Sequence, residues 1–154
     1  MHPPVEIGPA SAADYQPIAD LWVASWTAVM PAIDFKSRRD WLLAHLAKLE
    51  STGSRTLLAR DADQRPIGFV TLDPATGWLD QIAVSPSSFG RGAAHDLLDA
   101  AKALAPTGLQ LDVNADNPRA VRFYEREGFV TNGTGRNPTS GLPTRLMRWQ
   151  RDPT

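Results

Sequence analysis

The sequence predicts a mixed α/β (α+β) layer fold, with helices covering a sheet, in a single domain of residues 1–154. Three observations support this prediction. The chain is long enough to bury one core, and hydrophobic residues make up 42% of it. Stretches with the alternating pattern of strands also interchange with stretches at helical spacing, and no internal repeat or linker interrupts them. The predicted order of elements is β-α-α-β-β-β-α-β-α-β-β.

The first third of the chain is predicted to form one strand and two helices. A short strand covers residues 5–8, and the segment 11–14 resembles a capping box with an aspartate at its last position. The first helix ends at Pro31 and a second runs from about Asp34 to Glu50. Residues at helical spacing in the first helix are Ile18, Leu21, Trp22, Ser25, Trp26 and Val29.

The middle of the chain is predicted to form a hairpin, a third strand and a helix. Strands at 54–60 and 66–73 flank the turn "DADQR". The next strand covers 77–84 and ends before Pro86. A helix at 92–105 follows, with an apolar stripe of Ala93, Leu97, Leu98, Ala101 and Leu104.

The last part of the chain is predicted to contain one more helix between strands. Asn117 and Pro118 are typical of an N-cap followed by proline at the first helical position. Gly128 is predicted to end this helix in a left-handed conformation. A Gly/Asn/Pro/Thr-rich loop is expected at 132–143. The strands are predicted at 109–113, 129–131 and 144–150.

The composition excludes several classes of site and partner. Cysteine is absent, which rules out disulfides, thiolate metal sites and a cysteine nucleophile. His2, His45 and His95 are too scattered in sequence to suggest a zinc site, so we expect no metal. The net charge of −1 disfavours nucleic-acid binding through a basic surface. No apolar run suits a membrane span and no signal-peptide pattern is present, so we expect a cytoplasmic monomer or homodimer.

The segment "VSPSSFGRGAAHDLL", residues 84–98, places very small residues directly before a helix. A strand, a glycine-rich turn and a helix start form an anion-binding arrangement, because unpaired N–H groups and the helix dipole both attract negative charge. Arg91 adds positive charge, whereas His95 replaces the third glycine of a dinucleotide-binding motif. Taken alone, the segment also fits a plain turn before a helix. Its small residues are Gly90, Gly92, Ala93 and Ala94.

Together with a second block, this segment resembles the acetyl-CoA motif of the GNAT superfamily of N-acetyltransferases. That motif reads Q/R-x-x-G-x-G/A after a strand ending in V-x-P. Gly92 and Ala94 stand at its small-residue positions, while Phe89 departs from the Gln/Arg position and removes one polar contact. Further on, "LDVNADNPRAVRFYEREGF" resembles the family pattern L-x-V-x-x-x-N-x-x-A-x-x-F-Y-x-x-x-G-F. The order and spacing of the two blocks extend the resemblance over nearly the whole chain.

The resemblance implies a GNAT-like fold and a co-substrate. The fold is a central mixed, mostly antiparallel sheet of about seven strands, with about four helices on its faces, splayed between the fourth and fifth strands. Acetyl-CoA is the implied co-substrate, with its pantetheine arm between the splayed strands and its thioester carbonyl polarised by the N–H of Val84. Asn117 would contact the cofactor as well as cap its helix. The implied cofactor-binding residues are Ile82, Ala83 and Val84 for the pantetheine, Phe89, Gly90, Arg91, Gly92, Ala93, Ala94 and His95 for the pyrophosphate loop, and Asn117.

Acetyl transfer to an amine requires a base, because an amine with a pKa near 10 is mostly protonated at pH 7. Direct attack on bound acetyl-CoA is the simplest route, since no cysteine is present. Many family members carry a glutamate at the position of Trp78, and Asp80 lies two residues further on the same predicted strand face. Asp80 is the candidate base, directly or through a water, or it only hydrogen-bonds a neighbouring loop. The resemblance implies that Tyr124 protonates the leaving thiolate, and the alternative is a core aromatic.

The acceptor pocket implied by the resemblance lies between the first two helices and the late hairpin. Aromatic residues at helical spacing are more often core than pocket residues. Arg38 and Arg39 either attract an anionic acceptor or form a solvated face. Candidates for the pocket are Trp22, Trp26 and Trp78, with Phe35 and Trp41 as further aromatics.

We expect an N-acetyltransferase that moves an acetyl group from acetyl-CoA to a primary amine of a small molecule. Two alternatives stay open. An acetyltransferase of peptide N-termini or lysines would need an open groove for extended backbone. A non-catalytic acyl-CoA-binding sensor is suggested by Trp78 and Phe89, whereas the retained Tyr124 disfavours it.

Overall fold

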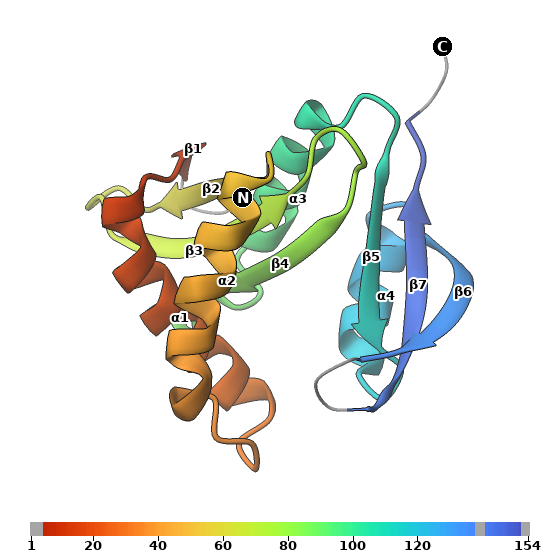
Figure 1. Ribbon diagram of the computed structural model, residues 1–154, viewed down its shortest axis with the longest axis horizontal. Helices are drawn as coiled ribbons and strands as arrows, with labels where there is room; N and C mark the ends of the chain where they lie inside the picture. The colour runs from red at the N-terminus through yellow and green to blue at the C-terminus, as the bar shows by residue number, and fades with distance from the viewer. Residues whose placement is uncertain (1–4, 138–140, 152–154) are drawn as a thin grey trace.

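The structure, a computed structural model, describes residues 5–137 and 141–151. Two sheets with helices packed on them make up this part of the chain (Figure 1). The N-terminal elements are β1 (Glu6–Pro9), α1 (Tyr15–Val29), α2 (Arg39–Ser51), β2 (Arg55–Arg60), β3 (Pro66–Leu72) and β4 (Leu79–Val84). The C-terminal elements are α3 (Ala93–Leu104), β5 (Leu109–Asn114), α4 (Pro118–Arg126), β6 (Val130–Arg136) and β7 (Pro143–Trp149). Short 3-10 turns cover Ala12–Asp14, Lys36–Arg38 and Pro86–Ser88.

The two sheets diverge between β4 and β5. The first sheet has the strand order β1-β2-β3-β4 and the second the order β5-β7-β6, and the described strand pairs are antiparallel. Trp78 and Gln110 form a parallel bridge at the start of β4 and β5, where the Gln110 N–H donates to the Gly77 carbonyl at 2.8 Å. Beyond this bridge the two strands separate (Figure 1). The splay expected between the fourth and fifth strands is therefore confirmed.

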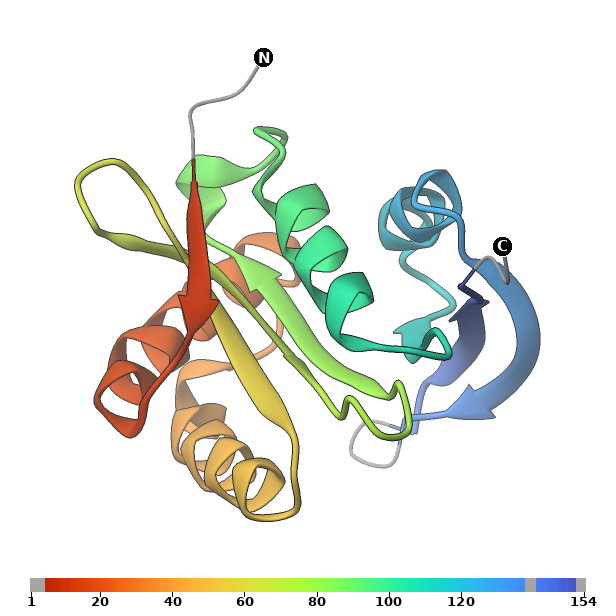
Figure 2. The ribbon, with the colours of Figure 1, turned by 90° about the horizontal axis from the view of Figure 1, so that it is seen from above.

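Helices cover both faces of the first sheet. Figure 2 shows α1 and α2 on one face and α3 on the other, with α4 beside α3. Successive strand side chains point to opposite faces of the sheet, so each face has its own hydrophobic core. Phe69 packs under α1 and α2, whereas the adjacent Val70 packs with α3 and α4 residues. Among the described residues, no helix combines the length and apolarity needed to cross a bilayer.

Two predicted boundaries were wrong for local reasons. The second helix begins at Arg39 rather than Asp34, because residues 36–38 form a separate 3-10 turn, next to which the Asp34 carboxylate accepts the Ser37 N–H at 3.2 Å. The loop expected at 132–143 is shorter, because β6 continues to Arg136 and pairs there with β7. Pairing with a neighbouring strand outweighs the turn-forming composition at these positions. Residues 138–140 of that loop lie outside the described part of the chain.

Candidate active site

One edge of β4 is unpaired where the two sheets diverge. Its other edge pairs with β3, and the Ser85 N–H donates to the Ile67 carbonyl at 2.8 Å. In an antiparallel pair the backbone polar groups of alternate residues point to the same edge, so those of Ala83 also face β3. This is a correction to the expected pantetheine contact of Ala83. The backbone groups of Ile82 and Val84 face the other edge, toward β5.

The loop between β4 and α3 contains two glycines with left-handed backbone. Gly90 has a φ of +74° and Gly92 a φ of +86°, a region that glycine adopts without steric cost. Gly92 is the N-cap of α3, so the N–H groups of residues 93–95 belong to the first turn, which a helix leaves unpaired. The Arg91 N–H instead donates to the Ser88 carbonyl at 3.2 Å. The Arg91 amide is thus engaged within the loop, whereas those of residues 93–95 are not.

Space beside this loop is open. A Cβ built on Gly90 would meet no heavy atom within 4 Å. Unpaired N–H groups at a helix start suit a phosphate group. The residues present therefore fit the pyrophosphate of acetyl-CoA.

An arginine from α4 lies over Phe89, the residue that stands at the Gln/Arg position of the family motif. The Arg119 guanidinium lies 5.8 Å from the centre of the Phe89 ring, a cation–π arrangement. Asn117 caps α4, because its Oδ1 accepts the Ala120 N–H at 3.2 Å, as the sequence predicted. The start of α4 thus brings a positive charge to the loop before α3.

His95 joins α3 to the end of α4. Its Nδ1 lies 2.6 Å from Glu127 Oε1, and its Nε2 lies 3.2 Å from Asp99 Oδ2. The hydrogen bond to Glu127 raises the pKa of His95 above its usual range, with nearby aspartates adding to the effect and partial burial opposing it. One ligand atom from each of the three side chains lies within 4.8 Å of the others. Such donors suit a divalent metal, but here the His95 ring is bonded to both carboxylates.

Tyr124 is a buried aromatic residue of the core of the molecule. It is 8% exposed and belongs to the same core cluster as Val84 and Ala93. Its ring packs edge-to-face on Phe129, with centroids 5.6 Å apart. No described residue hydrogen-bonds its hydroxyl. Burial raises the pKa of Tyr124 above the usual value, so the hydroxyl stays protonated at neutral pH and is available as a donor.

A β-bulge in β4 changes the direction of Asp80. Thr71 lies opposite Gln81 and Leu72 lies opposite Leu79, so Asp80 has no partner residue on β3. An extra residue in one strand interrupts the regular alternation of side chains. Asp80 and Gln81 therefore both point toward α1 and α2, although they are adjacent.

The bulge brings Asp80 to a histidine on α2. Asp80 Oδ1 lies 2.7 Å from Nε2 of His45, and Gln81 Nε2 donates to the same oxygen at 3.3 Å. Gln81 in turn accepts the indole N–H of Trp22 at 3.1 Å. Asp80 thus bonds a helix residue rather than the loop considered from the sequence. Sequence reasoning missed His45, since its only signal was the four-residue spacing from Trp41 on one helix face.

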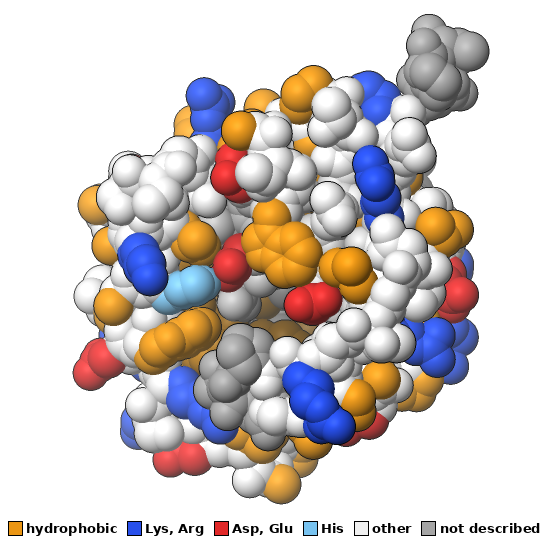
Figure 3. All heavy atoms as spheres, turned by 45° about the vertical axis from the view of Figure 1, so that its right-hand side comes forward, with side chains coloured by type: hydrophobic (Ala, Val, Ile, Leu, Met, Phe, Trp, Pro, Cys, Tyr) orange, Lys and Arg blue, Asp and Glu red, His pale blue; other side chains and the backbone are white. Residues whose placement is uncertain are grey.

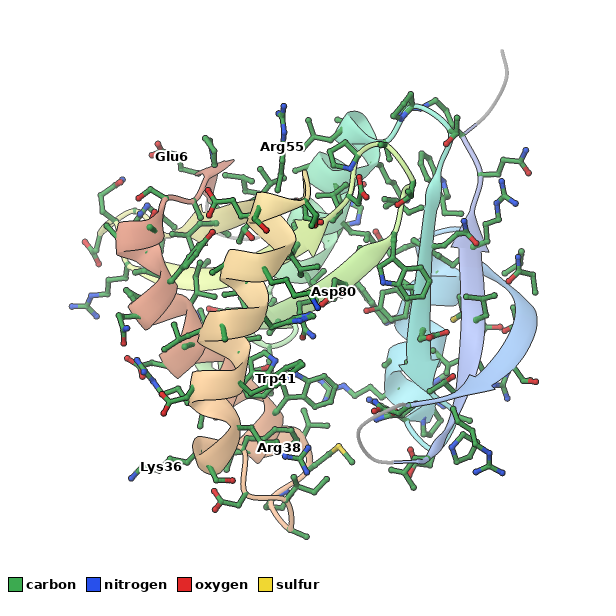
Figure 4. All side chains as sticks on the ribbon, in the orientation of Figure 1. Glu6, Lys36, Arg38, Trp41, Arg55 and Asp80 are labelled. Atoms are coloured by element: carbon green, nitrogen blue, oxygen red, sulfur yellow. The ribbon has the colours of Figure 1, made fainter. Side chains whose placement is uncertain are left out.

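Trp41 is an exposed aromatic residue beside His45. Its side chain is 48% exposed and stacks on the His45 ring, with centroids 4.6 Å apart and planes 14° from parallel. Figure 4 shows Trp41 and Asp80 on the side of α2 and β4 that faces the second sheet. Trp22 is only 4% exposed and belongs to the core, a correction to its assignment to the pocket, whereas Trp26 is partly buried and stacks on Phe35 at 5.8 Å.

Polar residues of β5 lie across from Trp41 and Asp80. Leu109, Leu111 and Val113 pack in the core, so the residues between them point to the other face of the sheet. Burial raises the pKa of Asp112 on that face. Figure 3 shows hydrophobic, acidic and histidine side chains around a hollow in the surface. Trp78 is half-buried and lies just before β4, at the bridge to β5.

The profile of the acetyltransferase (GNAT) family matches residues 15–129, which include both sequence blocks. The chain belongs to the GNAT acetyltransferase family. The matched region contains β4, the glycine-containing loop and α3.

Curated GNAT relatives share part of the chain. Peptidyl-lysine N-acetyltransferase YjaB of Salmonella typhimurium is 36% identical over 88 residues, covering 56% of this chain and 57% of YjaB. YjaB of Escherichia coli is 31% identical over 83 residues, covering 54% of each chain. An uncharacterised N-acetyltransferase of Mycobacterium tuberculosis is 33% identical over 98 residues, covering 59% of this chain and 63% of the relative. The chain therefore spans less than two thirds of the curated relatives it matches.

Solved GNAT structures share the fold at low identity. The apo form of YjaB from Escherichia coli superposes with a TM-score of 0.77 at 20% identity, covering 95% of this chain and 97% of that one. The PaiA N-acetyltransferase from Thermoplasma acidophilum, solved in complex with coenzyme A, gives a TM-score of 0.76 at 20% identity, covering 96% and 99%. These similarities support the fold of seven mostly antiparallel strands and four helices among the described residues.

Proposed function

We propose that the protein transfers an acetyl group from acetyl-CoA to a primary amine by direct attack of the amine on the thioester. One observation carries the proposal: the unpaired β4 edge leads directly into the anion-binding loop before α3. An extended pantetheine arm can pair with Ile82 and Val84 as an added strand. The pyrophosphate then reaches the N–H groups at the start of α3.

The side chains around this edge match the steps of acyl transfer. The amine nitrogen attacks the thioester carbonyl, a C–N bond forms, and the C–S bond breaks. The N–H of Val84 faces the gap and stabilises the developing oxyanion. The Tyr124 hydroxyl, protonated and without a described partner, donates a proton to the departing thiolate. A proton of the attacking amine passes to a base in the hydrogen-bonded pair of Asp80 and His45.

For the acceptor we propose a small primary alkylamine. Trp41 gives an apolar, exposed face beside the Asp80 carboxylate, which suits an ammonium group on a methylene chain. A lysine side chain has the same chemistry, and the name of the two YjaB relatives favours peptidyl lysine as a second candidate. The Tyr124 hydroxyl has no described hydrogen-bond partner and can donate to a leaving group, which argues against a non-catalytic acyl-CoA-binding sensor.

The test is a thiol-release assay with acetyl-CoA and an amine panel, with the acetylated product identified by mass spectrometry. The panel contains n-butylamine, spermidine, Nα-acetyl-lysine amide and a lysine-containing peptide. Amine-dependent release above the rate of acetyl-CoA hydrolysis supports the proposal, and the ratio of kcat/KM values between small amines and peptide separates the two acceptor classes. Binding of acetyl-CoA without transfer to any panel member would favour the sensor alternative.

A further inference from the structure

The His45 imidazole is held in one orientation by two neighbours. Its Nε2 bonds the Asp80 carboxylate at 2.7 Å, and the Trp41 ring stacks on its face. The side chains of His45 and Asp80 are 23% and 18% exposed, so the pair is partly shielded from water. An imidazole fixed by a carboxylate and an aromatic ring is pre-organised for proton transfer.

The carboxylate also selects the tautomer of the imidazole. Because an ionised carboxylate only accepts hydrogen bonds, Nε2 of the neutral ring carries the hydrogen and donates it to Asp80. Nδ1 then holds the lone pair. No described residue bonds His45 Nδ1, so this nitrogen is free to accept a proton.

An imidazole is better matched than a carboxylate to deprotonating an alkylammonium ion at neutral pH. A general base is most effective when its own proton affinity is suited to the operating pH, and of the ordinary side chains imidazole meets this condition near neutrality. Asp80 also has its Oδ1 already engaged by His45 and Gln81.

We propose that His45 is the catalytic base that removes the proton from the acceptor amine, and that Asp80 is a positioning residue that holds and stabilises the imidazole. The inference rests on the proposed function. One proton moves from the ammonium nitrogen to His45 Nδ1, and the freed lone pair attacks the acetyl carbonyl. As the C–S bond breaks, Tyr124 protonates the thiolate and regains a proton from the nitrogen that becomes the amide, so one proton in total remains on His45. The imidazolium, stabilised by the adjacent Asp80 charge, releases its proton to solvent after the product leaves.

The other charges near His45 have partners elsewhere or point to solvent. On α2, Arg39 pairs with Asp20 and Glu50 accepts the Tyr15 hydroxyl. The Arg38 guanidinium lies 5.5 Å from the centre of the Phe35 ring. Asp40 and Lys48 are exposed, and Asp112 lies across the gap on β5. Asp80 is therefore the charged side chain in contact with the His45 ring among the described residues.

The kinetic test uses n-butylamine and Nα-acetyl-lysine amide with four variants. His45→Gln keeps a donor toward Asp80 but lacks the basic nitrogen, so kcat falls about 10²- to 10⁴-fold while KM for acetyl-CoA is unchanged. Asp80→Asn lowers kcat less, because the imidazole remains. The double variant is no slower than His45→Gln, since Asp80 acts through His45. Lys48→Gln, an exposed change on the same helix, matches the parent.

The pH profile separates a base from a structural residue. In the parent, kcat/KM falls on the acid side as the base becomes protonated, and His45→Gln removes this limb. If His45→Gln keeps the parent profile, or if Asp80→Asn loses more activity than His45→Gln, the carboxylate is the base and the inference is overturned.

A measurement independent of turnover distinguishes this inference from the proposed function. Long-range ¹H–¹⁵N NMR of the imidazoles reports the tautomer of His45 directly. We expect the Nε2–H tautomer in the parent and its loss in Asp80→Ala. An Nδ1–H tautomer in the parent would overturn the assignment even if amines are acetylated. Failure of the parent to acetylate any panel amine, by contrast, would refute the proposed function and with it the base role.

Discussion

The guanidinium of Arg119 lies 5.8 Å from the centre of the Phe89 ring, so a residue of α4 contacts the loop that precedes α3. Phe89 stands where the family motif has glutamine or arginine. A polar side chain missing from the motif position is thus present nearby, on α4. This arrangement makes Arg119 a candidate contact for the phosphates of acetyl-CoA.

Arg119→Ala is expected to raise the Kd for acetyl-CoA about 10- to 100-fold, the equivalent of about 1.5–3 kcal/mol for one charge-assisted hydrogen bond. Isothermal titration calorimetry measures the change. Arg122→Ala is the matched control, because Arg122 is an exposed arginine of the same helix. Equal effects of the two substitutions would mean that Arg119 acts only through the net charge of the protein.

Gly92→Glu is expected to abolish detectable acetyl-CoA binding. The substitution puts bulk and negative charge at the start of α3, where phosphate oxygens would accept hydrogen bonds. It also forces a side chain into a φ of +86°, so a control for backbone strain is needed. Gly53→Glu provides it, since Gly53 has a φ of +104° at the far end of α2 and an open environment. Retained binding in Gly92→Glu would exclude this loop as the phosphate site.

Tyr124→Phe is expected to lower kcat about 10- to 1,000-fold with nearly normal acetyl-CoA binding. The ring and its packing on Phe129 remain, and the lost hydroxyl has no described partner, so the melting temperature should not fall. Tyr15→Phe is the contrasting control, because its hydroxyl donates to Glu50. That variant should lose stability and keep its kcat. An unchanged kcat in Tyr124→Phe, with chemistry rate-limiting, would leave Tyr124 a structural role only.

The His95–Glu127 pair predicts a pH dependence of stability. Folding raises the pKa of His95, so the charged imidazole stabilises the folded state. This contribution is full below the pKa of an unfolded histidine, near 6.5, and is lost as the pH rises through the higher folded-state value. Since His95 is half exposed, we expect at most about 1 kcal/mol.

Thermal melts of the parent and of Glu127→Gln at pH 6 and pH 9 test this dependence. The destabilisation by Glu127→Gln should be larger at pH 6, where the parent has the charged pair, than at pH 9. His95→Gln should flatten the same pH dependence. A destabilisation that is equal at both pH values would show that the pair contributes through its geometry alone.

Local sequence patterns predicted the elements around the proposed cofactor site. Asn117 and Pro118 begin α4 and Gly128 follows it with a φ of +95°, as expected from capping chemistry. The glycines before α3 likewise adopt the left-handed backbone that their residue type permits. These features depend on residues close in sequence, so they can be predicted before any long-range contact is known.

The amino-acid order alone therefore specified the family, the element order and the loop before α3, because backbone geometry and short motifs are local. The fold determined the direction of Asp80, since the bulge in β4 is created by its register with β3. It also brought His45, 35 positions away in sequence, to 2.7 Å from that carboxylate. Such contacts depend on how a helix packs against a strand. No local pattern encodes that packing, which is why Trp22 was assigned to the pocket and His45 was missed.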